Sequence, residues 1–104
     1  MYTCAETPTF VADVDKLWAE DERLEFLVWL AGNPEAGDVI PGSGGCRKVR
    51  WSRPGTGKRG SVRVIYFTRQ AAGEIWLLVV YAEAVRSSIP GHLLKAIRKE
   101  IENV

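Results

Sequence analysis

Histidine and cysteine are scarce in this sequence. Its 104 residues include one histidine, His92, and two cysteines, Cys4 and Cys46, which lack metal-ligand spacing. We therefore expect no protein-held metal, no cofactor, and a surface position for His92 rather than a catalytic one. The cysteines are expected to be free thiols of a reducing cytoplasm, with a disulfide between them as the alternative.

Long hydrophobic runs are also absent. The longest strongly apolar run, IWLLVVYA at 75–82, has eight residues, whereas a membrane-spanning helix needs about 20. The first residues, MYTCAETPTF, lack the basic and apolar regions of a secretory signal. The sequence therefore predicts a soluble cytoplasmic protein without membrane contact, and its length suits a single domain over residues 1–104.

Acidic residues are missing from one third of the chain. Residues 41–70 carry eight Lys or Arg and no acid, a net charge of +8. Residues 1–40 carry nine acids against two bases, a net charge of −7, although the whole chain has a net charge of only +1. This segregation predicts a face that attracts a polyanion. Alternatively, the acidic and basic parts pair with each other in the fold.

Two common enzyme motifs are absent from the basic segment. A phosphate-binding P-loop needs a glycine at position 52 and Ser or Thr after Gly57-Lys58, but the chain has Ser52 and Arg59. No GxGxxG motif opens a helix, and the acids lie mostly in predicted helices, which gives a paired-carboxylate hydrolase little support.

The pattern of apolar residues predicts an α+β fold. An extended start at 7–14 leads into apolar residues at helical spacing over 13–31, with a break near the acids at 19–22 and an end at Gly32-Asn33-Pro34. Three strands at 46–53, 61–68 and 75–82 are joined by short turns, so they form an antiparallel meander with the apolar third strand placed centrally. A C-terminal helix, capped by Ser87 or Ser88 with Pro90 in its first turn, should bury Leu93, Leu94, Ile97 and Ile101.

The alternation of the first two meander strands groups three cations. Lys48 and Arg50 fall on one face of the first strand, and hairpin pairing can bring Arg63 close to them. Such a cluster suits a nucleic-acid backbone, and the arginine fork suits phosphate. The alternative is a hairpin of solvated surface cations.

The order of motifs is similar to a known family. PEAGDVIPGSGGCRKVRW, GTGKRGSVRVIYF, IWLLVVYA and a C-terminal helix, together spanning roughly residues 24–100, resemble the RelE/HigB toxins of bacterial type II toxin–antitoxin modules, and most closely the HigB-like branch. The resemblance implies a small antiparallel sheet with an N-terminal helix pair and a C-terminal helix, as in RelE and ParE proteins.

The resemblance also implies an activity. Toxins of this family cut mRNA in the ribosomal A site without a metal, by attack of the message's 2′-hydroxyl on the adjacent phosphate. Carried over by position, Lys48, Arg50 and Arg63 are the expected catalytic residues. The residues expected to bind RNA or the ribosome are Arg47, Lys58, Arg59 and Tyr66, where Tyr66 either stacks on a base or packs in the core.

One position departs from the family pattern. Glu83 stands where the HigB-like pattern has a lysine, so a carboxylate replaces a cation beside the expected site. The alternatives are an active enzyme that tolerates Glu83, a degenerate or silenced toxin, and a gyrase-directed binder of the ParE kind. A generic RNA-binding domain has less support, since exposed aromatic pairs are not evident.

The resemblance implies partners as well. These are mRNA, the 70S ribosome and a cognate antitoxin, expected to be a helix-turn-helix protein like HigA. The acidic helices at 13–31 offer either a docking face for basic segments of a partner or simply a solvated surface.

Overall fold

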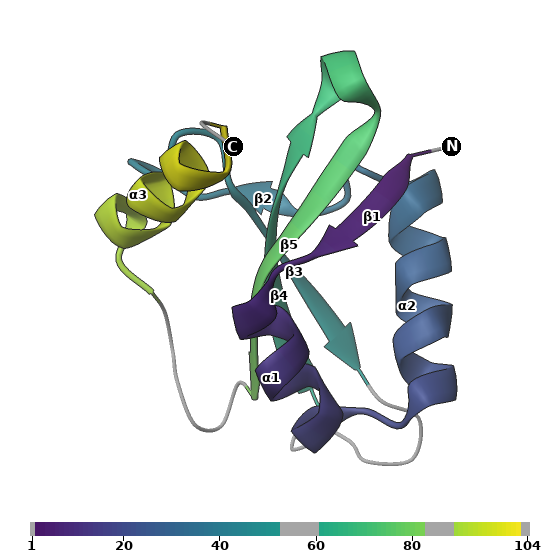
Figure 1. Cartoon of the computed structure of the whole chain (residues 1–104). Helices are drawn as coiled ribbons and strands as arrows, with labels where there is room; N and C mark the ends of the chain where they lie inside the picture. The colour runs from purple at the N-terminus through teal and green to yellow at the C-terminus, as the bar shows by residue number, and fades with distance from the viewer. Residues whose placement is uncertain (1, 53–60, 83–88, 103–104) are drawn as a thin grey trace.

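The chain alternates short helices with strands of one sheet (Figure 1). The computed structural model describes residues 2–52, 61–82 and 89–102. Its elements are β1 (Thr3–Glu6), α1 (Pro8–Leu17), α2 (Glu20–Gly32), β2 (Asp38–Val39), β3 (Arg47–Ser52), β4 (Ser61–Arg69), a 3₁₀ turn (Gln70–Ala72), β5 (Glu74–Ala82) and α3 (Gly91–Glu102).

The helix pair begins earlier than its sequence pattern indicated. Thr7 caps α1, since its Oγ1 accepts a hydrogen bond from the Phe10 N–H at 3.2 Å, and Pro8 occupies the first turn, where its missing N–H costs nothing. The expected extended stretch over 7–14 is therefore wrong. The predicted break is confirmed at Trp18 and Ala19, and acids occupy the first turn of α2, at the positive end of its dipole.

The sheet has the strand order β1-β5-β4-β3-β2. Strands β3, β4 and β5 form the predicted antiparallel meander, and β5 lies between two neighbours as expected. However, the sheet is mixed rather than purely antiparallel, because β1 pairs with β5 in parallel, with Thr3 opposite Glu74. The Thr7 hydroxyl secures this junction by donating to the Leu77 carbonyl oxygen at 2.9 Å.

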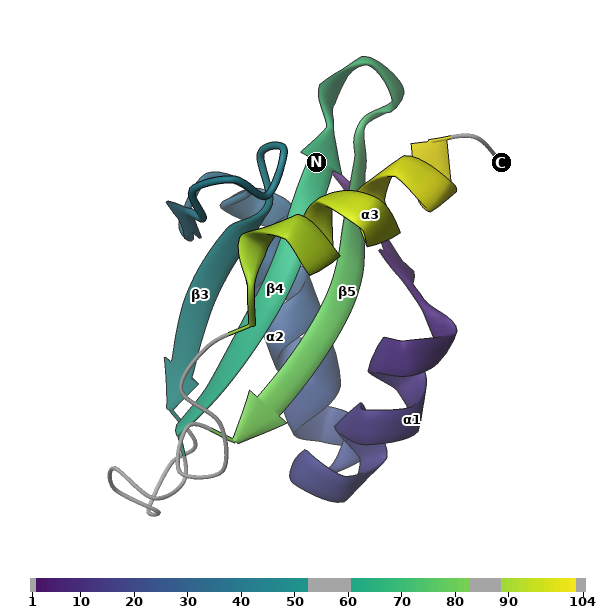
Figure 2. The ribbon, with the colours of Figure 1, turned by 90° about the vertical axis from the view of Figure 1, so that its left-hand side faces the viewer.

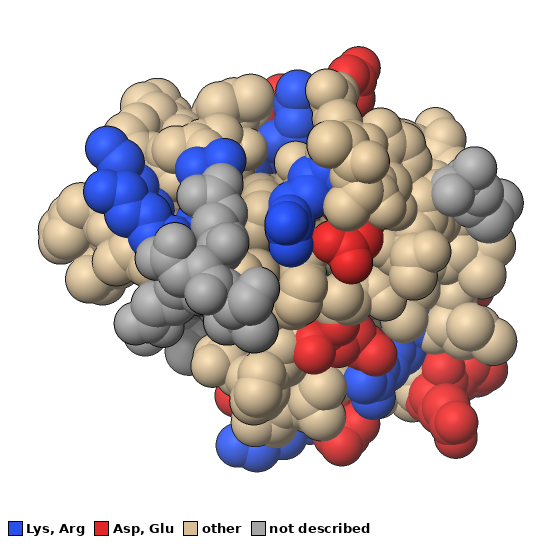
Figure 3. Space-filling view, turned by 45° about the horizontal axis from the view of Figure 1, so that its top comes forward, with Lys and Arg blue, Asp and Glu red and all other residues tan. Residues whose placement is uncertain are grey.

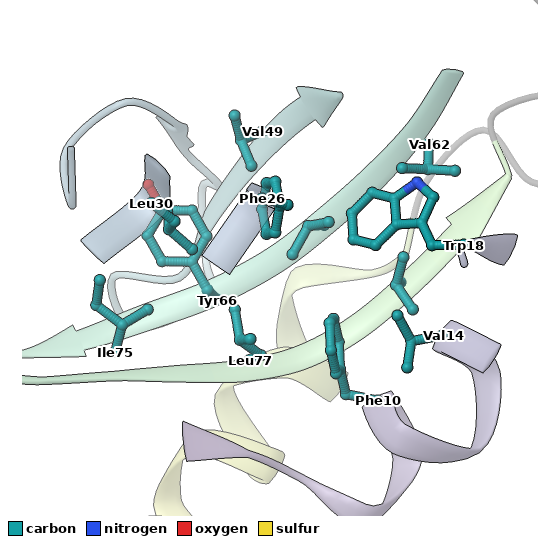
Figure 4. Close-up of a cluster of buried hydrophobic side chains, with 12 residues drawn as sticks. Phe10, Val14, Trp18, Phe26, Leu30, Val49, Val62, Tyr66, Ile75 and Leu77 are labelled. Atoms are coloured by element: carbon teal, nitrogen blue, oxygen red, sulfur yellow. The ribbon is translucent and has the colours of Figure 1, made fainter. Parts of the chain in front are cut away.

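Each face of the sheet is covered by different helices. Helices α1 and α2 pack on one face, and α3 crosses the other, as the two views in Figures 1 and 2 show. The first core lies beneath α1 and α2 and includes Phe10, Phe26, Tyr66 and Leu77, drawn in Figure 4. The second core lies beneath α3 and joins Leu94 to Cys46, Ile65, Phe67 and Leu78. Two small cores thus hold the sheet between them.

Aromatic side chains fill much of the first core. Phe26 lies 5.1 Å from Trp18, 6.1 Å from Trp29 and 5.2 Å from Trp51 between ring centroids. Tilted and edge-on rings at these separations add to the energy of burial. The cluster fixes α2 against β3, and therefore fixes the strand that carries Lys48 and Arg50.

Helix α3 buries fewer residues than its sequence indicated. Leu94 has no exposed surface, and Ile97 and Ile101 pack against the second core. Leu93 was expected to be buried but is 49% exposed, because it precedes Leu94 by one residue and so points about 100° away from it around the helix. His92 is exposed, as expected. The expected caps Ser87 and Ser88 lie outside the described residues.

Neither cysteine forms a disulfide. Cys4 and Cys46 are free thiols, and the Cys46 side chain is buried under α3. None of the helices in the described ranges is both long and apolar enough to cross a membrane.

Candidate nucleic-acid interface

Three cations share the sheet face that α3 crosses. Strand pairing sets Arg50 directly opposite Arg63, and Lys48 opposite Ile65. Since Ile65 belongs to the core beneath α3, these cations lie on the α3 side of the sheet. The prediction that pairing brings Arg63 beside Lys48 and Arg50 is confirmed.

Arg50 and Arg63 lie away from the part of the face where Leu94 of α3 packs. Leu94 clusters with Cys46 and Phe67, toward the start of β3 and the end of β4, whereas Arg50 and Arg63 lie toward the opposite strand ends. Lys48 lies between the two regions, opposite Ile65. Arg50 is exposed, and Lys48 and Arg63 are half-buried. A cationic surface that still reaches solvent is what a phosphate backbone requires.

Hydroxyl groups lie next to the cations, although none was predicted as a site residue. Arg50 Nη2 donates to Ser61 Oγ at 3.3 Å, and Ser61 Oγ lies 3.3 Å from Ser52 Oγ. Tyr81 of β5 is directly opposite Arg63, and its side chain is 8% exposed. Ser52 lies two residues after Arg50, and Ser61 lies two residues before Arg63, so each shares a strand face with a predicted cation. This spacing was visible in the sequence. The place of Tyr81 beside Arg63 follows only from the β4–β5 register.

Tyr66 belongs to the core rather than to an RNA surface. Its side chain has no exposed surface and lies among Phe26, Leu30 and Leu77 (Figure 4). The hydroxyl donates to the Pro34 carbonyl oxygen and accepts from the Gly37 N–H, both at 2.9 Å. A buried ring cannot stack on a base, so the stacking role is wrong and the packing alternative is correct. Burial raises the pKa of the Tyr66 hydroxyl, although the Gly37 N–H and Arg47 oppose that rise.

Arg47 lies away from the other cations. It alternates with Lys48 along β3, so its side chain leaves the opposite face of the strand. Arg47 Nη1 donates to the carbonyl oxygens of Gly37 at 2.7 Å and Glu35 at 3.4 Å. Together with Tyr66 it therefore organises the loop before β2, and it does not extend the surface formed by Lys48 and Arg50.

The acidic helices do not neutralise the strand cations. Arg23 of α2 takes Glu6 and Asp15 as partners, at 2.6 and 3.2 Å, and Arg69 lies 3.5 Å from Glu74. Within the described part of the chain, no ion pair joins a carboxylate of α1 or α2 to Lys48, Arg50 or Arg63. The two charged regions lie on different faces, so the alternative of mutual pairing is not supported.

The similarity of this chain to a known protein is one of fold rather than of sequence. No family model matches the sequence. A solved structure of a doubly substituted E. coli toxin RelE in the free state is similar, with a TM-score of 0.64 and 16% sequence identity. The match covers 93% of this chain and 96% of that chain. The chain has the RelE fold.

The RelE fold confirms the predicted fold class. Two arginines and a lysine on neighbouring strands carry N–H donors of the kind that bind phosphate oxygens. Lys58, Arg59 and Glu83, which the sequence placed at or near the site, lie outside the residues that the structure describes. Among the described residues, no group of three His, Cys, Asp or Glu side chains is placed to hold a metal ion.

Proposed function

We propose that this chain is the toxin of a type II toxin–antitoxin module and acts as a ribosome-dependent mRNA endonuclease. The observation that carries the proposal is the grouping of Lys48, Arg50 and Arg63 on one solvent-accessible sheet face. The RelE fold supports it, as do the motifs around these residues, which resemble the HigB-like branch. All 104 residues would act as one domain.

The proposed reaction uses a nucleophile within the message. The 2′-hydroxyl loses its proton and attacks the adjacent phosphorus, the bond to the 5′-oxygen breaks, and that oxygen takes up a proton. The products are a 2′,3′-cyclic phosphate and a 5′-hydroxyl end. Negative charge grows on the phosphate in the transition state, where fixed cations stabilise it more than in the ground state. In our assignment Arg63 and Arg50 contact this phosphate, and Lys48 holds the neighbouring backbone.

The partners follow from the same proposal. Lys58 and Arg59 would contact ribosomal RNA or the message, and the site of action would be the A site of the 70S ribosome in the cytoplasm. A cognate antitoxin, a helix-turn-helix protein of the HigA kind, would silence the toxin.

Glu83 favours a second candidate function. A carboxylate near the scissile phosphate would repel it, whereas the family pattern has a lysine there. The second candidate is therefore a binder with the RelE or ParE fold and no nuclease activity, either a degenerate toxin or a gyrase inhibitor, acting through its antitoxin complex.

Primer extension on an mRNA translated by purified 70S ribosomes separates these candidates. The chain would be compared with its Glu83→Lys variant, each with and without the ribosomes. Cleavage by both proteins that requires the ribosomes supports the nuclease. Cleavage by the lysine variant alone identifies a toxin that has lost activity through Glu83. Absence of cleavage by both overturns the nuclease and favours the binder.

A further inference from the structure

Helix α2 has apolar side chains on its solvent face as well as on its core face. Phe26 and Leu30 point inward and have no exposed surface, while Leu24 is 62% and Val28 57% exposed. These two are the most exposed large apolar side chains among the described residues. They are one helical turn apart, so they lie side by side on the outer surface. With half-buried Leu27 they form what we call the α2 stripe.

Carboxylates lie along one side of the α2 stripe and at its N-terminal end. At 100° per residue, Asp21 and Glu25 fall beside Val28, and Glu20 lies one turn before Leu24, between the directions of Leu24 and Leu27. All three acids are exposed and form no ion pair with any residue that the structure describes. The single cation of α2, Arg23, is held by Glu6 and Asp15. Figure 3 shows carboxylates gathered on the side of the molecule where α1 and α2 lie.

A shallow groove widens the α2 stripe toward β1. It is lined by Glu6, Glu20, Arg23, Leu24 and Leu27, so its floor is apolar and its rim is mostly acidic. Leu27 also packs against the first core, which α2 completes with Phe26 and Leu30, whereas Leu24 and Val28 do not belong to that core. The fold therefore leaves two exposed apolar side chains on α2, with carboxylates next to them.

We propose that the α2 stripe is a docking surface for a basic amphipathic helix of a partner protein. The apolar residues of such a helix would cover Leu24, Leu27 and Val28. Its lysines or arginines would face Asp21 and Glu25 along one side and Glu20 at the N-terminal end. Such a helix would match the α2 stripe in both apolar surface and charge. The charge complementarity would increase the association rate and the specificity of binding. The inference does not rest on the proposed function, because the α2 stripe lies on the opposite side of the sheet from Lys48, Arg50 and Arg63.

Charge argues against two other occupants. A second copy of this chain, docked by the same face, would bring two sets of carboxylates together without cations to offset them. An anionic membrane surface would be repelled for the same reason. A cationic helix removes the exposed apolar area and neutralises the acids together.

The test uses a synthetic helical peptide of about 18 residues as the probe, long enough to hold a helix when bound. Its leucines follow the i, i+3, i+4, i+7 pattern, and lysines and arginines flank them. One control peptide has the same composition with the leucines moved off the stripe, and a second has glutamates in place of the cations. Affinity is measured by fluorescence anisotropy with the full chain, and the bound surface is mapped by amide chemical shifts.

We expect the probe peptide to bind the unchanged chain and to shift the amide resonances of α2. Its affinity for Leu24→Ser/Val28→Ser should be lower by about tenfold or more. The Asp21→Asn/Glu25→Gln variant should bind more weakly and with a smaller dependence on salt. Val39→Ser and Leu93→Ser, which change similarly exposed apolar residues elsewhere, should bind as the unchanged chain does. All of these positions are exposed, and circular dichroism verifies that each variant is folded.

Four results overturn the proposal. The first is that the chain binds either control peptide as tightly as the probe, and the second is that Leu24→Ser/Val28→Ser binds the probe as tightly as the unchanged chain. The third is that the chemical-shift changes map away from α2, and the fourth is that the probe does not bind at all. Sedimentation and vesicle flotation identify the other occupants. A dimer that Leu24→Ser/Val28→Ser abolishes assigns the surface to self-association, and flotation with anionic vesicles assigns it to a membrane.

Discussion

Arg63 is the residue on which the proposed activity depends most. It lies on β4, opposite Arg50 of β3 on one side and Tyr81 of β5 on the other. We expect Arg63→Ala to abolish growth inhibition while the protein stays folded, since removing a cation that stabilises the transition-state phosphate typically costs about 10²-fold or more in rate. The matched control is Arg69→Ala, on the same face of β4 but paired with Glu74. Toxicity that persists in Arg63→Ala contradicts the assignment.

Tyr66 is a structural residue with a measurable contribution to stability. Its buried hydroxyl links Pro34 and Gly37 to the sheet through two hydrogen bonds. Tyr66→Phe keeps the ring but leaves the Gly37 N–H and the Pro34 carbonyl without this partner, so the free energy of unfolding should fall by about 1–3 kcal/mol. Urea denaturation measures the change. An unaltered midpoint and slope would mean that water replaces the hydroxyl at no cost.

The same hydroxyl makes the free energy of unfolding depend on pH in the alkaline range. Burial raises the pKa of Tyr66 in the folded protein above its ordinary value of 10.0, so the fold favours the neutral phenol. This contribution is complete below pH 10.0 and is lost as pH rises through the folded-state pKa, because the unfolded chain ionises first. Denaturation curves at pH values on either side of 10.0 should show a steeper decline for the unchanged protein than for Tyr66→Phe. Parallel curves contradict this account.

At the scale of elements, β3 carries two of the three cations and is expected to dominate backbone binding. Lys48→Ala and Arg50→Ala should each weaken ribosome binding, and each should lower the slope of log affinity against log salt by about one, because each removes one cation from the phosphate backbone. Lys16→Ala, a change of an exposed lysine on α1, is the control. A slope that does not change in either β3 variant would argue against binding to phosphate.

The start of α3 is fitted closely to the loop before β3. A Cβ atom added at Gly91 would meet the carbonyl oxygen of Pro41 and the backbone of Gly42. Alanine improves helix propensity by about 1 kcal/mol, but overpacking against backbone costs about 1–3 kcal/mol, so Gly91→Ala should destabilise the protein. Gly32→Ala has open space around the new atom and should be neutral or stabilising. Thermal denaturation compares the two; equal midpoints contradict the close fit.

Sequence patterns predicted the long elements, placed the N-terminal extended segment at 7–14 instead of at β1, and missed β2. The apolar periodicity of α2 and the run at β5 identify those elements without any knowledge of neighbours. In contrast, β1 has four residues and β2 has two, too few for a pattern, and each is a strand only because a partner strand lies beside it. A parallel partner far along the chain leaves no local signal in β1.

The candidate site was predictable where it depends on alternation within one hairpin. The cluster of Lys48, Arg50 and Arg63 forms because side chains alternate between the two faces of a strand and because hairpin strands pair. Both features can be predicted from the sequence. Tyr66 was assigned in part to RNA because a tyrosine beside cations suits either a base or a core, and only its burial distinguishes the two. Tyr81 was missed because its place beside Arg63 depends on the β4–β5 register, which contains an irregularity between Ile65 and Tyr66.

At the scale of the whole molecule, the fold separates opposite charges onto opposite sides of one sheet. Helices α1 and α2 carry carboxylates on one side, and the strand cations face the other. A net charge of +1 therefore conceals a strong dipole, which would orient the molecule with its cations toward an RNA surface during approach. The acidic side would then point away from that surface, where the α2 stripe stays open to a partner.

The parallel pairing of β1 with β5 also determines when the sheet can be completed while the chain is being synthesised. Thr7 and its hydrogen-bond partner Leu77 are separated by 70 positions, and β1 has no other strand neighbour among the described residues. Strand β5 must therefore have left the ribosomal exit tunnel before the sheet can close, so folding is late and dominated by non-local contacts. A nascent chain stopped before residue 74 lacks the strand to which both Arg63 and the N-terminal segment attach. The N-terminal segment, although it is made first, therefore has to wait for β5 before it can join the sheet.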